Sequence, residues 1–316
     1  MPSATPSKYG SLIVLDLDLS SFPNRNGRIL NFKSDGSDLK ELVTGLKHLP
    51  DGIAVDSEEG NFYWTNMGES PSSPWDGSIQ RCDLDGKNIT TILPPGILYT
   101  PKQLTLARPR DAPPALYLCD REGMRVMRCG LDGSNVETLV QTGKVPEHQG
   151  DQSRWCVGIA VDTESGVMYW TQKGPSKGNQ GRIFRAPLAV PKETSPDSRP
   201  DIELLFDKLP EPIDLHIDVA TKILYWTDRG DPPYGNTVNC ARVEEVEGAS
   251  GPKCMERRVL SRKLHEGIGL ALDEENGRMF FTDLLGGVYS ANLDGSDKKV
   301  LYDDLGDCTG IAYSCQ

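Results

Sequence analysis

Short apolar stretches separated by polar turns recur along this chain at nearly constant spacing. Residues 52–56 read Gly-Ile-Ala-Val-Asp and, after a polar turn, residues 62–65 read Phe-Tyr-Trp-Thr. Related pairs of stretches occur at 103–106 with 116–120, 158–162 with 168–171, 213–218 with 224–228, and 269–273 with 279–283. The period of about 50 to 56 residues is typical of propeller-type repeats.

Each repeat predicts four short strands. The first is the Gly-Ile-Ala-Val-Asp stretch, and the second ends at Tyr-Trp-Thr and is rich in the aromatic and β-branched residues that strands favour. A third begins near a Gly-x-Ile motif, and a Leu-Asp-Gly turn such as residues 84–86 leads to a fourth apolar strand. Asp and Gly supply the local hydrogen bond and the positive φ of a tight hairpin. Complete repeats span about 51–95, 99–143, 156–209, 211–264 and 266–305.

The two ends of the chain together make a sixth repeat. Residues 10–45 supply a second, third and fourth strand, whereas residues 308–316 supply a first strand alone. Pairing the C-terminal strand with the N-terminal strands closes the ring and leaves no open sheet edge. The prediction is an all-β, six-bladed β-propeller that forms a single domain over residues 1–316.

The Tyr-Trp-Thr-Asp stretches, with their Leu-Asp-Gly-Ser turns, resemble the YWTD six-bladed β-propellers of the low-density-lipoprotein-receptor class. This resemblance covers the whole chain. Some positions depart from it: Asn66 and Gln172 stand where the pattern has Asp, and Leu118-Cys119 stands where it has Trp-Thr. The cysteine-rich modules that flank receptor propellers are absent from this sequence, which argues against a receptor role.

Composition narrows the classes of partner. The net charge of -12 and the pI of about 4.9 argue against binding nucleic acid or an anionic membrane by bulk electrostatics. No stretch approaches the ~18 apolar residues of a membrane span, and the apolar run 12–15 is too short for a signal peptide. We therefore expect a cytoplasmic protein.

The eight cysteines show no zinc-site spacing. We expect most of them to be reduced, buried, small apolar residues. Cys240 with Cys254, and Cys308 with Cys315, are the pairs that could form a bridge.

The predicted strand order assigns the connecting loops to two faces. Connections from the second to the third strand, and from the fourth strand to the next blade, lie on one face, called the upper face below. These loops are long and irregular and carry the aromatic residues Trp75, Tyr99, Trp155 and Tyr234. We expect them to wall a concave, largely apolar funnel that binds substrate.

Aligning the repeats predicts a ring of residues at the upper end of the central channel. The position before each first strand is occupied by Asp51, Lys102, Val157, Glu211, Glu266 and Thr309. Asp51, Glu266 and Thr309 are predicted substrate contacts. So are Asp120, Asp228 and Asp283 at the ends of second strands, although these repeated aspartates could instead bind turn amides. Lys102, His265, Asn66 and Gln172 break the repeat and are the predicted catalytic residues, which would polarise a carbonyl or hydroxyl.

No hydrolase elbow, His-Glu-x-x-His motif or phosphate-binding glycine loop occurs, and we expect neither a cofactor nor a metal. Free-standing YWTD propellers of this length are similar to fungal hetero-Diels-Alderases of tropolonic sesquiterpene biosynthesis. This resemblance implies a cofactor-independent enzyme of secondary metabolism. It would hold an apolar terpenoid alkene and a reactive diene, a quinone methide, in near-attack geometry.

Two alternatives stay open. The propeller could be a protein-binding platform like its receptor relatives. It could also be a calcium-dependent, lactonase-like hydrolase that uses Asp51, Asn66 and Glu266. The sequence leaves the oligomeric state open.

Overall fold

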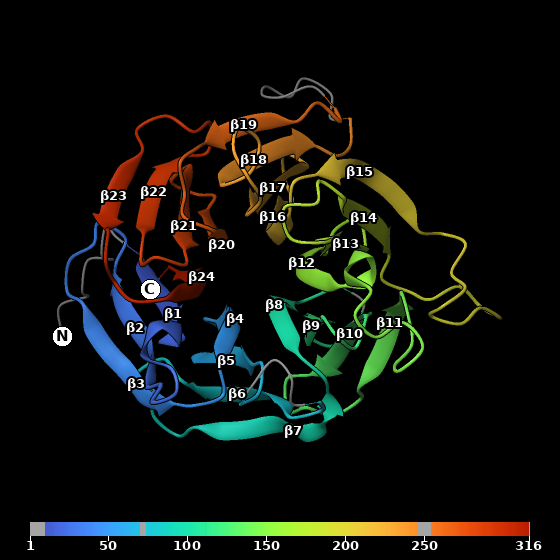
Figure 1. The fold of residues 1–316 in the computed structure, drawn as a ribbon, viewed down its shortest axis with the longest axis horizontal. Coiled ribbons are helices and arrows are strands. Elements are labelled where there is room, and N and C mark those ends of the chain that lie inside the picture. Colours follow the sequence, from blue (N-terminus) through green and yellow to red (C-terminus); the bar gives the residue numbers. More distant parts are fainter. Residues whose placement is uncertain (1–9, 70–73, 111, 246–253, 316) are drawn as a thin grey trace.

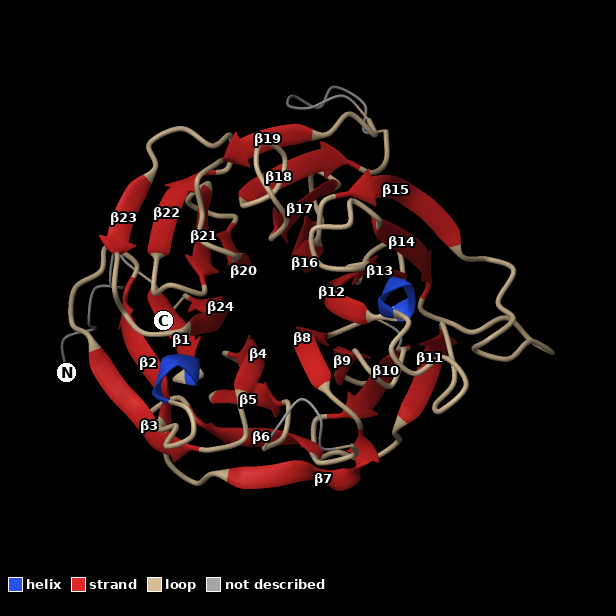
Figure 2. Cartoon of the chain, viewed as in Figure 1, coloured by secondary structure: helices blue, strands red, loops and turns tan. Residues whose placement is uncertain are grey.

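A computed structural model describes residues 10–69, 74–110, 112–245 and 254–315 of the 316-residue chain. Within these residues, six four-stranded antiparallel sheets surround a central axis (Figure 1). The predicted all-β, six-bladed propeller is therefore confirmed. Helix in the same residues is limited to two short turns, η1 (Leu19–Ser21) and η2 (Gln152–Arg154) (Figure 2).

The blades are numbered in chain order, and each is given from its inner to its outer strand. Blade 1 is β24 (Cys308–Ser314), β1 (Ser11–Asp16), β2 (Gly27–Lys33) and β3 (Lys40–Leu46); blade 2 is β4 (Pro50–Asp56), β5 (Asn61–Asn66), β6 (Gly77–Asp83) and β7 (Thr90–Leu98). Blade 3 is β8 (Pro101–Ala107), β9 (Ala115–Asp120), β10 (Arg125–Gly130) and β11 (Glu137–Gln141); blade 4 is β12 (Cys156–Asp162), β13 (Val167–Gln172), β14 (Gly181–Pro187) and β15 (Glu203–Leu209). Blade 5 is β16 (Pro212–Asp218), β17 (Ile223–Asp228), β18 (Thr237–Arg242) and β19 (Arg258–Ser261); blade 6 is β20 (Gly267–Asp273), β21 (Arg278–Asp283), β22 (Val288–Asn292) and β23 (Lys299–Tyr302).

Blade 1 joins the two ends of the chain. The C-terminal strand β24 pairs antiparallel with β1, from Ser11 opposite Ser314 to Asp16 opposite Cys308. The two strands lie side by side at the inner end of this blade (Figure 1). This pairing supplies the inner strand that residues 10–46 lack, so the predicted closure of the ring is confirmed.

Apolar side chains of the second strands fill the space between neighbouring blades. Trp64, Trp170 and Trp226 are almost fully buried. Trp64, for example, packs with Ile13 and Leu15 of blade 1. Because each such cluster is shared by two blades, burying these large aromatic groups stabilises the ring as a whole rather than single sheets.

The repeated threonine links four of the six blades to the next one. The Thr171 hydroxyl accepts the Gly158 N–H at 2.7 Å and donates to the Ile213 carbonyl of blade 5 at 3.0 Å. Thr65, Thr227 and Thr282 make the same pair of bonds. Inner strands therefore approach closely, and a Cβ added at Gly158 would lie 2.1 Å from the Ile213 carbonyl oxygen.

The eight cysteines are free thiols, so neither Cys240 with Cys254 nor Cys308 with Cys315 forms a bridge. Burial raises the pKa of Cys82 to about 12 and that of Cys240 to about 11. These two buried thiols therefore stay protonated near neutral pH.

Candidate functional site

The strand register corrects the predicted ring at the upper end of the channel. Pro212 pairs with Asp228 and Gly267 with Asp283, just as Pro50 pairs with Asn66. The ring therefore consists of the second residue of each inner strand, namely Asp51, Lys102, Val157, Ile213, Ile268 and Thr309. Glu211 and Glu266 were predicted there wrongly, because Pro210-Glu211 resembles Pro50-Asp51 but lies two residues earlier.

This upper ring has an apolar half. Val157, Ile213 and Ile268 are buried and form one cluster, against which Leu284 packs. Leu284 also packs against a second cluster, formed by Leu17, Leu49 and Met67 on the opposite side of the ring. Leu284 therefore joins the apolar residues of the two clusters at the upper end of the channel. The concave, largely apolar funnel expected from the sequence stays a prediction, and the ring at its base has an apolar half and a polar half.

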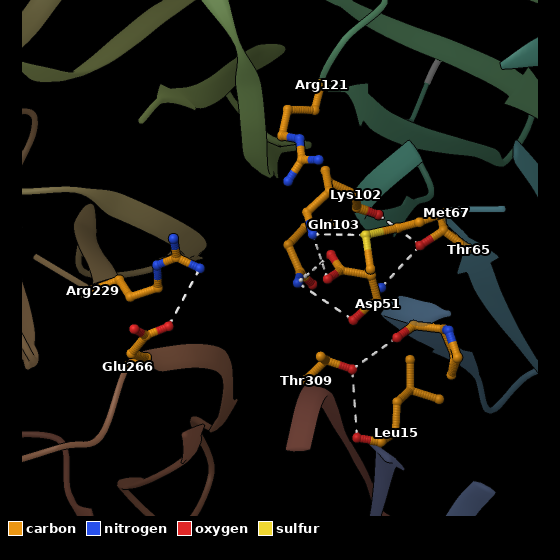
Figure 3. A network of polar contacts seen from close by, with 12 residues as sticks. Leu15, Asp51, Thr65, Met67, Lys102, Gln103, Arg121, Arg229, Glu266 and Thr309 are labelled. Atoms are coloured by element: carbon orange, nitrogen blue, oxygen red, sulfur yellow. Dashed lines mark hydrogen bonds and ion pairs between the residues drawn. The ribbon is translucent and has the colours of Figure 1, made fainter. Parts of the chain in front are cut away.

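The polar half of the ring is a buried network on blades 1 to 3 (Figure 3). The Lys102 ammonium donates to Asp51 Oδ1 at 2.6 Å and lies 3.0 Å from the sulfur of Met67. Gln103 Nε2 lies 3.2 Å from Asp51 Oδ2, and the Thr309 hydroxyl donates to the Pro50 carbonyl. The Lys102 side chain is 11% exposed. Asp51 is thus the shared acceptor of two side chains from blade 3.

Two ionisable groups of this region have shifted pKa values. Burial lowers the pKa of Lys102 to about 8, although the Asp51 carboxylate opposes the shift. Burial raises the pKa of Asp214 to about 8, although backbone N–H bonds from Leu270 and Leu215 oppose that shift. Groups that titrate near neutral pH can give or take a proton in a reaction.

Around the upper ring lies a rim of ion pairs and one aromatic face. The Arg121 guanidinium lies 5.0 Å and the Lys173 ammonium 5.5 Å from the centre of the Trp155 ring. Lys173 and Arg229 both pair with Glu211, at 2.8 and 2.9 Å. Figure 3 shows Arg229 and Glu266 facing Lys102 and Arg121 from the other side of the site. The rim can therefore bind polar groups of either sign.

Trp155 adds a hydrogen-bond donor to this rim. Its Nε1 atom is buried and has no hydrogen-bond partner among the residues that the structure describes. Lys173, with its ammonium beside the same ring, is itself buried. An oxygen-bearing ligand that reached this edge of Trp155 would meet an indole N–H without a partner, and two cations lie near the same ring.

The other predicted catalytic residues do not meet Lys102. His265 is 65% exposed, with Nδ1 3.8 Å from Asp283 Oδ2. Asn66 is buried inside blade 2, where its amide donates to Ser78 and Gln80. Gln172 is buried in blade 4 and accepts from Arg182. The structure thus brings Lys102 together with Asp51 and leaves His265, Asn66 and Gln172 apart.

The aspartates at the ends of second strands have structural partners. Asp120 accepts the N–H groups of Tyr99 and Thr100 and pairs with Arg125. In the same way, Asp228 accepts the Glu211 N–H, and Asp283 accepts the His265 N–H and the Tyr289 hydroxyl. All three carboxylates are buried. These bonds agree with the alternative set out from the sequence, in which the repeated aspartates bind turn amides.

The predicted aromatic walls separate into three places. Trp155 lies at the rim beside Arg121 and Lys173. Trp75 and Tyr99 pack on each other, with ring centres 5.3 Å apart, and Tyr99 is buried. Tyr234 is exposed on the upper loop of blade 5, beneath Arg257. They do not form one continuous apolar wall.

Gln103 and Asp214 are site residues that the sequence interpretation missed. They occupy the third position of β8 and β16, where β4, β12, β20 and β24 carry Gly52, Gly158, Gly269 and Gly310. A register-correct alignment of the repeats would have shown both as exceptions to glycine.

Comparison with known proteins shows the family to which this chain belongs. No protein-family model matches the chain. It is 52% identical over 307 residues, covering 95% of this chain and 97% of the other, to "Low-density lipoprotein receptor-related protein 1" of Pyricularia oryzae. The chain belongs to the same family as this fungal receptor-related protein.

A second relative in the same comparison has a different name. The chain is 40% identical over 312 residues to "3-hydroxyacyl-CoA dehydrogenase-like protein LAM1" of Cochliobolus heterostrophus. The match covers 96% of this chain but 64% of that protein, so the chain spans about two thirds of that relative's length.

Solved structures share the fold of this family at low identity. The propeller of a nidogen/laminin complex superposes with a TM-score of 0.69 at 18% identity, covering 96% of this chain and 98% of that one. TolB from Acinetobacter baumannii superposes with a TM-score of 0.65 at 10% identity, covering 96% of this chain and 66% of that one. These likenesses show the fold alone.

Three further observations concern metal binding and membrane-spanning helices. Within the described ranges, no three His, Cys, Asp or Glu side chains gather as a group that could hold a metal ion. Asp51, Asn66 and Glu266 bind separate partners, Lys102, Ser78 and Arg229 respectively. No helix in the described part of the chain is long and apolar enough to cross a bilayer.

Proposed function

We propose that this propeller is a small-molecule enzyme in which Lys102, held by Asp51, is the acid–base group at the upper end of the channel. The buried ion pair carries this proposal. Blades 4, 5 and 6 fill the same ring position with Val157, Ile213 and Ile268, so the ring itself needs no charge there. A buried ion pair contributes little net stability because both charges lose their hydration. A role in chemistry or binding accounts for it better.

The chemistry follows from a lysine whose pKa is about 8. Its ammonium can donate a hydrogen bond or a proton to a substrate carbonyl, and its neutral amine can take one back. The indole N–H and flat face of Trp155 supply a second contact at the rim. Leu284, which packs against the apolar half of the ring, supplies an apolar contact for the substrate.

The narrower form of the proposal is a hetero-Diels-Alder cycloaddition of a terpenoid alkene with a quinone methide. Such a reaction requires a defined pose and a donor on the carbonyl oxygen of the diene. One such hydrogen bond, when it strengthens in the transition state, contributes about 2–4 kcal/mol, or about 10²–10³ in rate. Lys102 and Trp155 are the donors available for this role.

A protein-binding platform is the second candidate, and one observation favours it. Several apolar side chains on upper loops are exposed, including Phe22 at 69% and Leu285 at 65%. The nidogen propeller was solved in complex with laminin, which is a statement about that protein. The dehydrogenase-like name of the Cochliobolus relative favours an enzyme instead, although it does not say which part of that longer protein it describes.

The experiment compares Lys102→Met with Lys87→Met, an exposed turn lysine that gives the same chemical change. A sesquiterpene alkene and a quinone methide generated in situ are mixed with each protein, and product yield and stereochemistry are measured. We expect acceleration over the uncatalysed reaction that Lys102→Met lowers at least about tenfold and Lys87→Met leaves unchanged. Equal reaction rates with and without wild-type protein would contradict the proposal that this protein catalyses the cycloaddition.

A further inference from the structure

A cavity of about 210 Å³ occupies the middle of the channel, below the upper ring. Inner strands line it, with Gln103, Thr105, Asp214 and His216 as its polar side chains of interest. It shares Thr105, Leu215 and His216 with a second cavity of about 350 Å³, which reaches the lower turns at Thr163, Val219 and Glu274. No residue of the upper ring lines either cavity. The middle of the channel is therefore reached from the lower face, opposite to Lys102.

The side chains of this cavity are exceptions to the repeat. The third and fifth residues of the inner strand are Gly and Ala in four blades: Gly52 and Ala54, Gly158 and Ala160, Gly269 and Ala271, Gly310 and Ala312. In β8 they are Gln103 and Thr105, and in β16 they are Asp214 and His216. Two blades thus carry polar pairs where the ring elsewhere needs none.

The ring makes room for these side chains. At the glycine positions, a Cβ would meet backbone of the next inner strand, 2.6 Å away at Gly52 and 2.1 Å away at Gly158. The pairs β8–β12 and β16–β20, which hold the polar exceptions, are the two least tightly packed neighbouring pairs of inner strands. These two seams are therefore occupied by the Gln103 and Asp214 side chains, and Asp214 bonds across its seam to the Leu270 N–H.

The polar wall offers hydrogen-bonding groups of both kinds. The Asp214 oxygens accept the N–H groups of Leu215 and Leu270, each at 2.9 Å, and burial keeps its carboxyl protonated near neutral pH because the pKa is raised to about 8. His216 Nε2 lies 3.5 Å from Glu274 Oε1 of blade 6. Each inner strand also turns one edge of its sheet toward the channel, where the Gly52, Gly158 and Gly269 N–H groups already bond to threonine hydroxyls.

Charge and size limit what fits between these groups. No Lys or Arg lines the middle cavity, so an anion would find no cation there. An apolar terpene would offer no hydrogen bond to the Gln103, Thr105, Asp214 and His216 side chains that line the cavity, which costs free energy. At about 30 Å³ for each water in the liquid, the cavity holds the volume of roughly seven waters.

We propose that the middle of the channel binds a small, neutral, polyhydroxylated molecule that enters from the lower face and bonds to Gln103, Thr105, Asp214 and His216. The proposal does not rest on the chemistry assigned to Lys102, although Gln103 belongs to both sites through its bond to Asp51. A ligand of this size has a Kd in the low-millimolar range when each of its non-hydrogen atoms contributes the binding free energy that is typical of drug-sized ligands.

The test titrates wild-type protein with xylitol and erythritol by ligand-observed NMR and calorimetry. The key variant is Thr105→Ala/His216→Ala, which restores the Ala that four other blades carry and is therefore expected to fold with an unchanged melting temperature. We expect at least about tenfold weaker xylitol binding in this variant. Lys87→Met, at an exposed turn lysine, should bind xylitol like wild type, and Lys102→Met is titrated alongside it.

Three outcomes would overturn the proposal. The first is no saturable binding of either polyol by wild-type protein. The second is equal binding by wild type and by the folded double variant. The third is loss of polyol binding in Lys102→Met with retention in the double variant, which would place the ligand at the upper end. Failure of the cycloaddition assay affects none of these readouts, so the two proposals fail separately.

Discussion

The ammonium of Lys102 lies 2.6 Å from a carboxylate oxygen of Asp51, and both side chains are nearly enclosed at the upper end of the channel. The two residues come from β8 and β4, so the pair joins blades 2 and 3. Gln103 adds a second bond to the same carboxylate. The pair thus links two blades, and it is formed by the two charged residues of the ring.

Removing one partner of this pair should cost more than replacing both. Breaking a buried ion pair leaves a charge without compensation and costs about 3–5 kcal/mol, whereas uncharged substitution of both partners is often neutral. We expect Asp51→Asn to lower the unfolding free energy clearly, and Asp51→Asn/Lys102→Met to recover most of that loss. Urea denaturation of the two single variants and the double variant measures the coupling energy. Additive effects would contradict a coupled pair.

The raised pKa of Asp214 makes stability depend on pH in a defined direction. Its value of about 8 in the folded protein lies above the unfolded value of about 3.9. Between these values the folded state binds more protons than the unfolded state, so the contribution to stability is lost as the pH rises through this window. Asp214→Asn removes the titration. We expect the variant to gain stability relative to wild type from pH 5 to pH 8, by up to about 1.4 kcal/mol per pH unit.

The measurement is the urea midpoint of both proteins at several pH values in that window. Asp201→Asn is a matched control, because the Asp201 pKa is lowered by its bond to Arg199 and the residue lies away from the channel. Its difference from wild type should stay flat over the same window. A flat difference for Asp214→Asn as well would show that the Asp214 carboxyl is already ionised.

Closure of the ring predicts the effect of a C-terminal deletion. Without residues 308–316, blade 1 loses β24, and the apolar cluster that contains Ile311 and Cys308 loses its inner wall. We expect the truncated protein to lose its cooperative melting transition, whereas deletion of residues 315–316 should leave the transition near its wild-type temperature. Calorimetry checks both. An unchanged transition in the longer deletion would mean that β24 contributes nothing to closure.

The fold was predictable because the sequence repeats with a nearly constant period. The residues of the site were harder to predict, for a physical reason. A strand register shift of two residues keeps every side chain on the same face. Pro210-Glu211 could therefore be aligned with Pro50-Asp51, and the error placed two glutamates in the ring in place of Ile213 and Ile268. Anchoring the alignment at the opposite end of the strand, Asp56 with Asp218, gives the correct register.

Loop residues were the second difficulty. Sequence identifies Trp75 and Trp155 as aromatics outside the repeat, but the direction of a loop side chain depends on contacts far along the chain. Trp155 faces the rim because Arg121 and Lys173 flank its ring. Trp75 instead packs on Tyr99. Lys102 could be found because it sits in a regular strand, where the position along the repeat sets its place in the ring.

The placement of His265 and Trp155 gives the last prediction, and it reverses an expectation drawn from the sequence. His265 is 65% exposed and touches neither Lys102 nor the rim pairs, so His265→Ala should change turnover and melting temperature little. Trp155→Ala should weaken binding of a substrate at the upper site by about 1–3 kcal/mol, because it removes an aromatic face, a donor and the contact that orients Arg121. Binding affinity, turnover and melting temperature are measured together for both variants. Trp75→Ala, at an aromatic residue away from the rim, controls for loss of packing in a loop. If His265→Ala slows turnover as much as Lys102→Met, the reacting groups lie on the exposed upper surface of blade 6 rather than around the ion pair.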